Sequence, residues 1–370
     1  MFLRWKELYD VPGFLPLNEK GDALMTSSLL PTRFTSLVGI QYPIMQDGMG
    51  SGSFTTGHIA AAVSEAGGLG SVSVADLWAE PSSAERVFRG QMELVATTTS
   101  RPFAANIPIG VDHTGDVMPA SKDHLRYVLE AREADSALAT QLCVVTTSGG
   151  PPDEFSSIIK DAGMMHLHKV GSTRQALRAE RVGVDAVIAS GFEMGGHTHS
   201  RPVHTFVLAA NVTEAISVPV LISGGVRDGR GLAAALCFGA DGVAMGTRFI
   251  ATEEGQWHPA IIERVLQAKE GDDTIFPGIY GPIRGLRNEA TAFLEKLIAD
   301  GATPEEITDW KAAAFRRVQD EGDVHMGLFP TGQVASGIES VVRIDDLLPQ
   351  MVHDAVTIFQ RMCLRSTGGT

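Results

Sequence analysis

The 370-residue sequence has few cysteines, no long apolar run and no cluster of basic residues. Its cysteines, Cys143, Cys237 and Cys363, are far apart and odd in number, which excludes a C-x-x-C metal pair and a disulfide framework. Each lies in an apolar run, so we expect buried, reduced thiols in a cytoplasmic protein. No uncharged apolar stretch reaches about 18 residues, and charges near the N-terminus exclude a signal peptide.

Charge restricts the range of partners. The formal net charge is −14 and the sequence pI is about 5.2. A polyanion would be repelled at long range, so we expect neither a nucleic-acid partner nor a membrane partner.

From residue 40 onward, short apolar runs alternate with amphipathic segments. The runs are 42–46, 70–74, 103–109, 142–147, 165–170, 186–190, 218–223 and 242–247. Short, uncharged, often β-branched runs are typical of parallel strands buried on both faces, and eight in succession predict a (β/α)₈ TIM barrel. An open doubly wound sheet is the alternative, but no G-x-G-x-x-G follows the first run.

The remaining segments predict four regions. Residues 1–30 form an N-terminal arm, and its apolar segments MFLRW and FLPL suggest a contact surface, such as that of a homodimer. Residues 31–256 form the barrel. Residues 257–340 form a mostly helical insertion after strand eight. Residues 341–370 carry the helix that closes the barrel.

Glycines follow the last two predicted strands. Gly224 and Gly225 come after strand seven, and Gly246 comes after strand eight, just before Thr247. Phosphate sites of TIM barrels favour these two loops, and glycines allow backbone N–H groups to approach a phosphate. Tight turns alone would explain one such site, but two at paired positions favour a phosphate-bearing ligand.

Several motifs together are specific. They are YPIMQDGMG, AVSEAGGLGSVSV, RPFAANIPI, GVDAVIASGFEMGGHTH, VPVLISGGVRDGRGLAAALCFGADGVAMGTRF and TGQVASGI. With them the sequence resembles the nitronate monooxygenase family, which also contains flavin-dependent enoyl-acyl carrier protein reductases. The resemblance implies a TIM barrel that binds FMN non-covalently.

The resemblance also implies residues that contact the flavin. Gln46, Asp47, Gly48 and Met49 would run beside the isoalloxazine, which Asn106 and Lys169 would face. Ser223, Gly224, Gly225, Gly246 and Thr247 would hold the phosphate. Gly195 and Gly196 would lie against the ring, and Gln333 would come from the late covering loop.

The segment GFEMGGHTHS places His197 after strand six, at the mouth of the barrel. An imidazole titrates near neutrality, so His197 can take a proton from carbon, which is the role that the resemblance implies. A loop histidine without chemistry is the second interpretation. A zinc site with His199 and His204 is the third, but no nearby Cys, Asp or Glu completes a tetrahedral set, so we predict no metal.

Some residues depart from the family pattern, which usually has Ala-Pro-Met where this sequence has QDGM. Asp47 adds a carboxylate near the flavin, and His199 replaces a small glycine. Thr146, Thr147 and Ser148 would line the substrate pocket with hydroxyl groups.

The resemblance implies that an alkyl nitronate or similar carbon acid is oxidised with oxygen. The alternatives are an NAD(P)H-dependent reductase of an enoyl thioester or quinone, and a barrel that binds flavin or another phosphorylated ligand without turnover.

Overall fold

The computed structural model describes residues 30–50, 56–74, 81–112, 114–278 and 281–366. The ends of its eight parallel strands lie within two residues of the ends of the predicted runs, which confirms the TIM barrel. They are β1 (Ile44–Gln46), β2 (Gly70–Ser73), β3 (Phe103–Ile109), β4 (Leu142–Gly149), β5 (Met165–Val170), β6 (Ala186–Ser190), β8 (Val220–Ser223) and β9 (Gly242–Met245). The predicted arm, 1–30, lies almost wholly outside the described residues.

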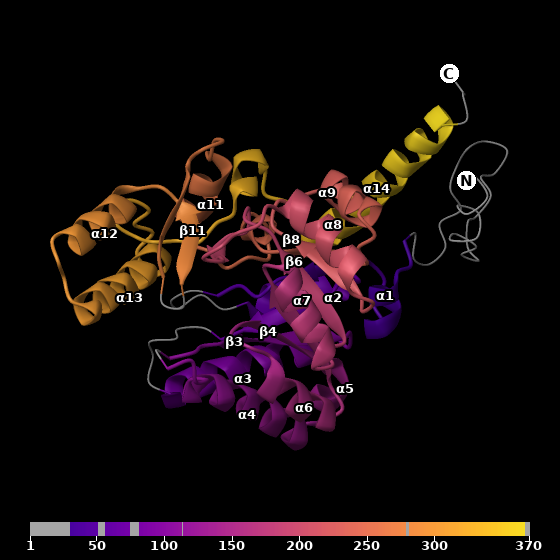
Figure 1. Cartoon of the computed structure of the whole chain (residues 1–370), viewed down its shortest axis with the longest axis horizontal. Coiled ribbons are helices and arrows are strands. Elements are labelled where there is room, and N and C mark those ends of the chain that lie inside the picture. Colours follow the sequence, from indigo (N-terminus) through magenta and orange to yellow (C-terminus); the bar gives the residue numbers. More distant parts are fainter. Residues whose placement is uncertain (1–29, 51–55, 75–80, 113, 279–280, 367–370) are drawn as a thin grey trace.

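Helices cover the outside of the barrel (Figure 1). Those between strands are α2 (Gly57–Glu65), α3 (Pro81–Thr98), α4 (Pro119–Ala134), α5 (Ser136–Gln141), α6 (Asp153–Asp161), α7 (Thr173–Arg181), α8 (Thr205–Ala215) and α9 (Gly229–Cys237). The last helix, α14 (Ile344–Ser366), packs against α9 and α2 and so completes the outer ring. None of the helices in the described ranges combines the length and the apolar character needed to cross a bilayer.

The barrel closes between β1 and β2, where strand pairing is limited to one bridge, Met45 to Leu69. The fully buried Gln46 amide completes this closure: its Nε2 donates to the Ser71 carbonyl at 2.9 Å, and its Oε1 accepts from the Ser71 N–H at 3.1 Å. Gln46 therefore has a structural role between two strands. Both ends of its amide are used by β2.

The inside of the barrel is apolar at its centre. Met45, Leu69, Ala104, Val144, Leu167, Ala186, Ile188, Leu221 and Ala244 form this core with Phe34. Phe34 belongs to α1 (Arg33–Val38), which covers the amino ends of the strands. The mixture of large and small residues fills the interior, so no channel crosses it.

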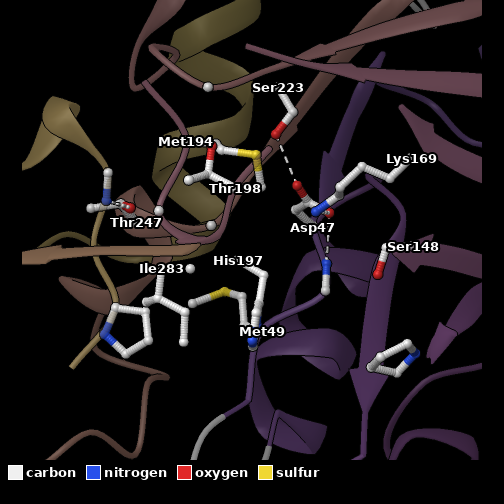
Figure 2. A pocket seen from close by; sticks show the side chains of 18 of the residues that line it. Asp47, Met49, Ser148, Lys169, Met194, His197, Thr198, Ser223, Thr247 and Ile283 are labelled. Atoms are coloured by element: carbon white, nitrogen blue, oxygen red, sulfur yellow. Dashed lines mark hydrogen bonds and ion pairs between the residues drawn. The ribbon is translucent and has the colours of Figure 1, made fainter. Parts of the chain in front are cut away.

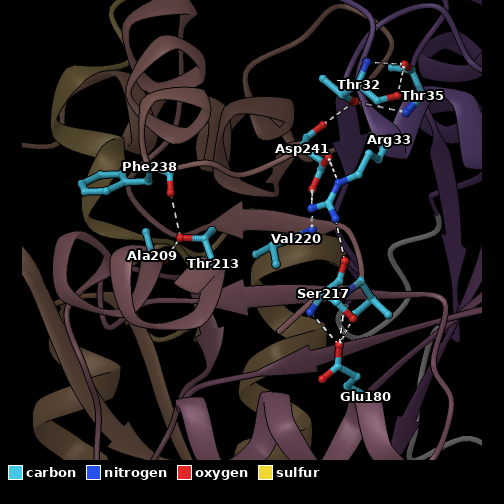
Figure 3. A network of polar contacts seen from close by, with 11 residues as sticks. Thr32, Arg33, Thr35, Glu180, Ala209, Thr213, Ser217, Val220, Phe238 and Asp241 are labelled. Carbon is cyan, nitrogen blue, oxygen red and sulfur yellow. Dashed lines mark hydrogen bonds and ion pairs between the residues drawn. The ribbon is translucent and has the colours of Figure 1, made fainter. Parts of the chain in front are cut away.

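An ion pair fastens α1 to the barrel (Figure 3). The Arg33 guanidinium donates to both carboxylate oxygens of Asp241, at 2.8 and 2.6 Å, and to the Ser217 carbonyl at 2.5 Å. The same carboxylate accepts from the Val220 N–H at 3.1 Å. This bidentate pair holds α1 over the amino ends of the strands. A site would therefore lie at the opposite end of the barrel, at the carboxyl ends.

The insertion contains a hairpin besides its helices. It contains α11 (Pro259–Leu266), α12 (Glu289–Ala299), α13 (Pro304–Asp320), η1 (Gln333–Gly337) and a hairpin of β10 (Asp273–Pro277) and β11 (Pro282–Leu286). Its hairpin pairs with β7 (Gly196–His197) in a three-stranded antiparallel sheet. A separate core of Phe276, Ile283, Ala290, Leu294, Ala314, Phe315 and Leu328 supports it. The insertion lies beside the barrel, away from α14 (Figure 1).

The cysteines also differ from expectation. All three are free, but Cys143 is only partly buried, and Cys237 and Cys363 are exposed.

Two histidines share one threonine on the outer face of the barrel. The Thr147 Oγ1 lies 2.7 Å from His166 Nε2 and 2.8 Å from His168 Nδ1. Both rings are buried, so Thr147 faces the helices, and the prediction that it lines a pocket is corrected. Burial lowers the pKa of His166 to about 3 and of His168 to about 4, from 6.5.

We predict that the free energy of unfolding falls as the pH is lowered below 6.5, the ordinary histidine value. The unfolded chain then binds more protons than the folded one, so stability present above pH 6.5 is lost as the pH approaches 4 and then 3. The loss at about pH 5 is on the order of 1–2 kcal/mol per histidine. Urea unfolding at about pH 8 and about pH 5 measures it.

The variant His166→Gln/His168→Gln should lose less stability between these pH values. His353→Gln, at an exposed position on α14, should behave like the wild type. An equal pH dependence in the double variant would contradict the assignment to this pair.

Candidate active site

A cavity of about 540 Å³ opens at the carboxyl ends of the barrel strands. It is lined by strand ends, by the segment after β6, and by the insertion, which contributes Ile283 and Phe315 among others. Cavities of this size hold cofactors or drug-sized ligands, and this end of a TIM barrel is where active sites form.

The structure brings most of the predicted site residues together around this cavity. They are Asp47, Gly48, Met49, Asn106, Ser148, Lys169, Gly195, Gly196, His197, His199, Ser223, Gly224, Gly225, Gly246 and Thr247. The residues come from seven different strand ends or loops, so only the closed barrel places them side by side. Figure 2 shows several of them facing a common space.

Four predicted residues are not among the described residues that line the cavity. Gln46 joins β1 to β2 and Thr147 faces the helices, as described above. The Thr146 Oγ1 donates to the Asn106 Oδ1 at 3.1 Å and is buried. The Gln333 Nε2 lies 3.2 Å from the Asp273 Oδ2, so its side chain turns toward the hairpin, although its neighbours Gly332 and Val334 do line the cavity.

His197 is placed by the insertion as well as by the barrel. It pairs with Ile283 of β11, and the next N–H, of Thr198, donates to the Pro282 carbonyl at 2.8 Å. The residue is exposed where it lines the cavity, and protein around the ring desolvates it. This desolvation, with the charges of Lys311 and Lys169, lowers the pKa of His197 to about 4. The imidazole is therefore neutral at neutral pH and can accept a proton.

Asp47 has well-defined partners in the cavity wall. Its Oδ1 lies 2.7 Å from the Lys169 Nζ, and its Oδ2 accepts from the Ser223 Oγ at 2.8 Å. The Gly48 N–H also donates to Oδ1, at 2.8 Å. The dashed lines in Figure 2 mark contacts of this carboxylate. Asp47 is thus neutralised by Lys169 and does not present a free negative charge to a ligand.

The turn after β8 has a backbone that favours glycine. Gly224 and Gly225 both have φ of 87°, in the left-handed region. A Cβ on Gly224 would lie 3.0 Å from the Gly191 carbonyl oxygen, so the segments after β6 and β8 pack closely. Two successive left-handed residues at a cavity suit a backbone that cradles an anion.

Two buried polar atoms on the cavity-lining residues lack hydrogen-bond partners among the described residues. They are Thr198 Oγ1 and His199 Nε2. The His199 ring packs on Gly171, where a Cβ would lie 1.9 Å from the ring. Because buried polar groups are normally paired, these atoms fit a ligand with polar groups of its own. Together with the glycine turn, they make the cavity suitable for a phosphorylated cofactor and a substrate.

The sequence reasoning missed Arg284 on β11. This fully buried guanidinium pairs with Asp273, donates from Nε to the Phe192 carbonyl at 3.1 Å, and lies 4.3 Å from the centre of the Phe192 ring. It therefore joins the hairpin to the segment that carries His197. The available signal was the pair of short apolar runs 273–277 and 282–286 around glycines, which is typical of a hairpin.

Comparison with known proteins gives the family. The family model for nitronate monooxygenase matches residues 31–354. The chain belongs to this family. This confirms the resemblance seen in the motifs, and the chain is accordingly an oxidoreductase.

Two curated relatives match along most of their length. A (3aS,4S,5R,7aS)-5-hydroxy-7a-methyl-1-oxo-octahydro-1H-indene-4-carboxyl-CoA dehydrogenase of Mycobacterium tuberculosis is 30% identical, over 90% of this chain and 98% of its own. A probable nitronate monooxygenase of Staphylococcus aureus is 29% identical, over 80% of this chain and 90% of its own.

Solved structures share the fold of this chain. FabK of Thermotoga maritima superposes with a TM-score of 0.78 at 31% identity, over 90% of this chain and 98% of its own. A nitroalkane oxidase of Streptomyces ansochromogenes superposes with a TM-score of 0.73 at 23% identity, over 89% and 99%. The second likeness supports the barrel alone.

We predict that Arg284→Met lowers the free energy of unfolding by about 3–5 kcal/mol, because it leaves the Asp273 carboxylate half-buried without its cation. Urea unfolding measures the loss, and hydrogen exchange at the His197 and Thr198 amides tests whether β7 separates from β11.

The matched control is Arg343→Met, which breaks an exposed ion pair with Asp345 and should lower the free energy of unfolding much less than Arg284→Met. Arg284→Met/Asp273→Asn should recover part of the stability. Equal losses in the two arginine variants would contradict a special role for the buried pair.

Proposed function

We propose that the chain is an FMN-dependent oxidoreductase that oxidises a carbon acid, with His197 as the base. A carbon acid has a C–H bond made acidic by a neighbouring nitro or carbonyl group. The observation that carries the proposal is the neutral imidazole, with its pKa lowered to about 4, in a cavity that also contains the left-handed glycine turn.

The residues present fit FMN. Backbone N–H groups at Ser223–Gly225 and Gly246–Thr247 would hold its phosphate, because glycines allow close approach and these loops follow the last two strands. The Ser223 hydroxyl is used by Asp47, so its backbone would serve here. Asp47, Gly48, Met49, Asn106, Lys169, Gly195 and Gly196 would line the rest of the cofactor site.

When bound, FMN supplies a two-electron acceptor for the oxidation. In an activity of the nitronate monooxygenase type, it passes the electrons on to oxygen. The residues of the chain would handle the proton and the charge. Neutral His197 would accept the α-proton, and the nearby cations Lys169 and Lys311 would stabilise negative charge that develops on the substrate. The Ser148 and His199 side chains, with Thr198, would bind the polar end of the substrate.

Two carbon acids are candidates for the substrate. A nitroalkane, the carbon acid whose conjugate base is an alkyl nitronate, is supported by the family and by the Staphylococcus aureus relative. A thioester of coenzyme A is supported by the Mycobacterium tuberculosis relative, which matches over 98% of its length. Both substrates place the acidic carbon next to an electron-withdrawing group, so one base serves either. A cytoplasmic location and a homodimer stay predictions from the sequence.

We predict that the purified protein is yellow and that its flavin absorbance bleaches anaerobically with a nitroalkane or an acyl-CoA thioester. His197→Asn should slow this bleaching by about 10²–10⁴-fold, the usual contribution of a general base, with unchanged flavin content. Stopped-flow absorbance measures the rate, with NAD(P)H tested in parallel.

His325→Asn is the matched control, because this histidine is exposed on the insertion and pairs only with exposed Glu289. It should bleach like the wild type. Bleaching by NAD(P)H alone would overturn the carbon-acid proposal in favour of a reductase of an enoyl thioester or quinone. Yellow protein that no donor bleaches would indicate a binding barrel, and absence of flavin would overturn the cofactor.

A further inference from the structure

Asp47 joins three strands at the mouth of the barrel. It follows β1, while its partner Lys169 lies one residue before the end of β5 and its partner Ser223 ends β8. The Asp47 side chain is 8% exposed and that of Lys169 is 13% exposed, so both charges lie in the cavity wall with little access to bulk water. A pair of opposite charges at 2.7 Å in such a position is strongly coupled.

The partners of Asp47 occupy both of its carboxylate oxygens. One oxygen faces the Lys169 ammonium and the Gly48 N–H, and the other accepts from the Ser223 hydroxyl. These contacts hold the carboxylate in place. Its effect on a ligand must therefore be exerted through the position and the net charge of Lys169.

Ser223 extends this arrangement to the glycine turn. Its hydroxyl donates to Asp47, while the next two residues are the left-handed Gly224 and Gly225. The same carboxylate thus fixes a cation on one side of the cavity and the start of the proposed phosphate turn on another.

We propose that Asp47 is a positioning residue that holds the Lys169 ammonium in the cavity wall and offsets its charge, thereby lowering the reduction potential of the bound flavin. The inference rests on the proposed function, because it requires FMN in this cavity. Two-electron reduction adds negative charge to the flavin, and a cation stabilises that charge. With Asp47 present, the pair has no net charge, so the reduced cofactor gains less stabilisation than an isolated lysine would give.

The test is the midpoint potential of the bound flavin in Asp47→Asn, measured anaerobically against a reference dye. Asparagine keeps the shape of aspartate but leaves the charge of Lys169 unbalanced. We expect the potential to become more positive, with at least a tenfold change in the equilibrium between reduced and oxidised flavin, about 30 mV for a two-electron couple.

Two variants provide controls. Asp47→Asn/Lys169→Met removes both charges, so the midpoint potential of its bound flavin should return toward that of the wild type. If the single variant Asp47→Asn does not fold, this double variant is compared with the wild type in its place. Ser223→Ala removes one neutral hydrogen bond to the same carboxylate and should shift the potential much less than Asp47→Asn.

Flavin binding, followed by fluorescence, separates the possible outcomes. A wild-type protein that binds no FMN would overturn the proposed function, and this inference with it. Normal binding with equal potentials in wild type and Asp47→Asn would overturn the inference alone. Weaker flavin binding in Asp47→Asn and in Asp47→Asn/Lys169→Met, without any shift in potential, would show that Asp47 is merely structural. That result would also overturn the inference.

Discussion

The site depends on the pairing of a two-residue strand, β7, with β11 of the insertion. The barrel alone ends β6 at Ser190 and leaves the following segment on the surface of the mouth. Antiparallel pairing at Gly196 and His197, with the buried Arg284 behind it, fixes that segment over the cavity. The insertion is therefore part of the active site, since the candidate base is held by hydrogen bonds from it.

The charge state of His197 depends on the protein and the charged side chains around it. Surrounding protein and two lysines favour the neutral imidazole of His197. One of these lysines, Lys311, is 4% exposed and donates to the Gly278 carbonyl of the insertion. The other, Lys169, has its charge offset by Asp47. The barrel and the insertion thus each supply a cation near the base, and only the barrel supplies the compensating carboxylate.

The sequence alone predicted the barrel because buried parallel strands leave a local signal, short apolar runs. Most of the residues that it assigned to the site also line the cavity, since they follow those runs directly. The sequence analysis did not predict the hairpin, because its first strand ends at Pro277 and its second begins at Pro282. Prolines at these positions make both strands resemble irregular segments next to clear helices. The roles of Gln46 and Gln333 could not be read locally, because each side chain is directed by a partner in another element. The Asp47 ion pair likewise joins residues far apart in sequence.

The central claim is that the glycine turns at the barrel mouth hold the phosphate of a flavin. The most direct measurement is a fluorescence titration of flavin-free protein with FMN and, separately, with riboflavin, which lacks only the phosphate. Hydrogen bonds to a charged group are worth about 1.5–3 kcal/mol each, so FMN should bind at least tenfold more tightly than riboflavin. Equal affinities, or no binding of either flavin, would contradict the account.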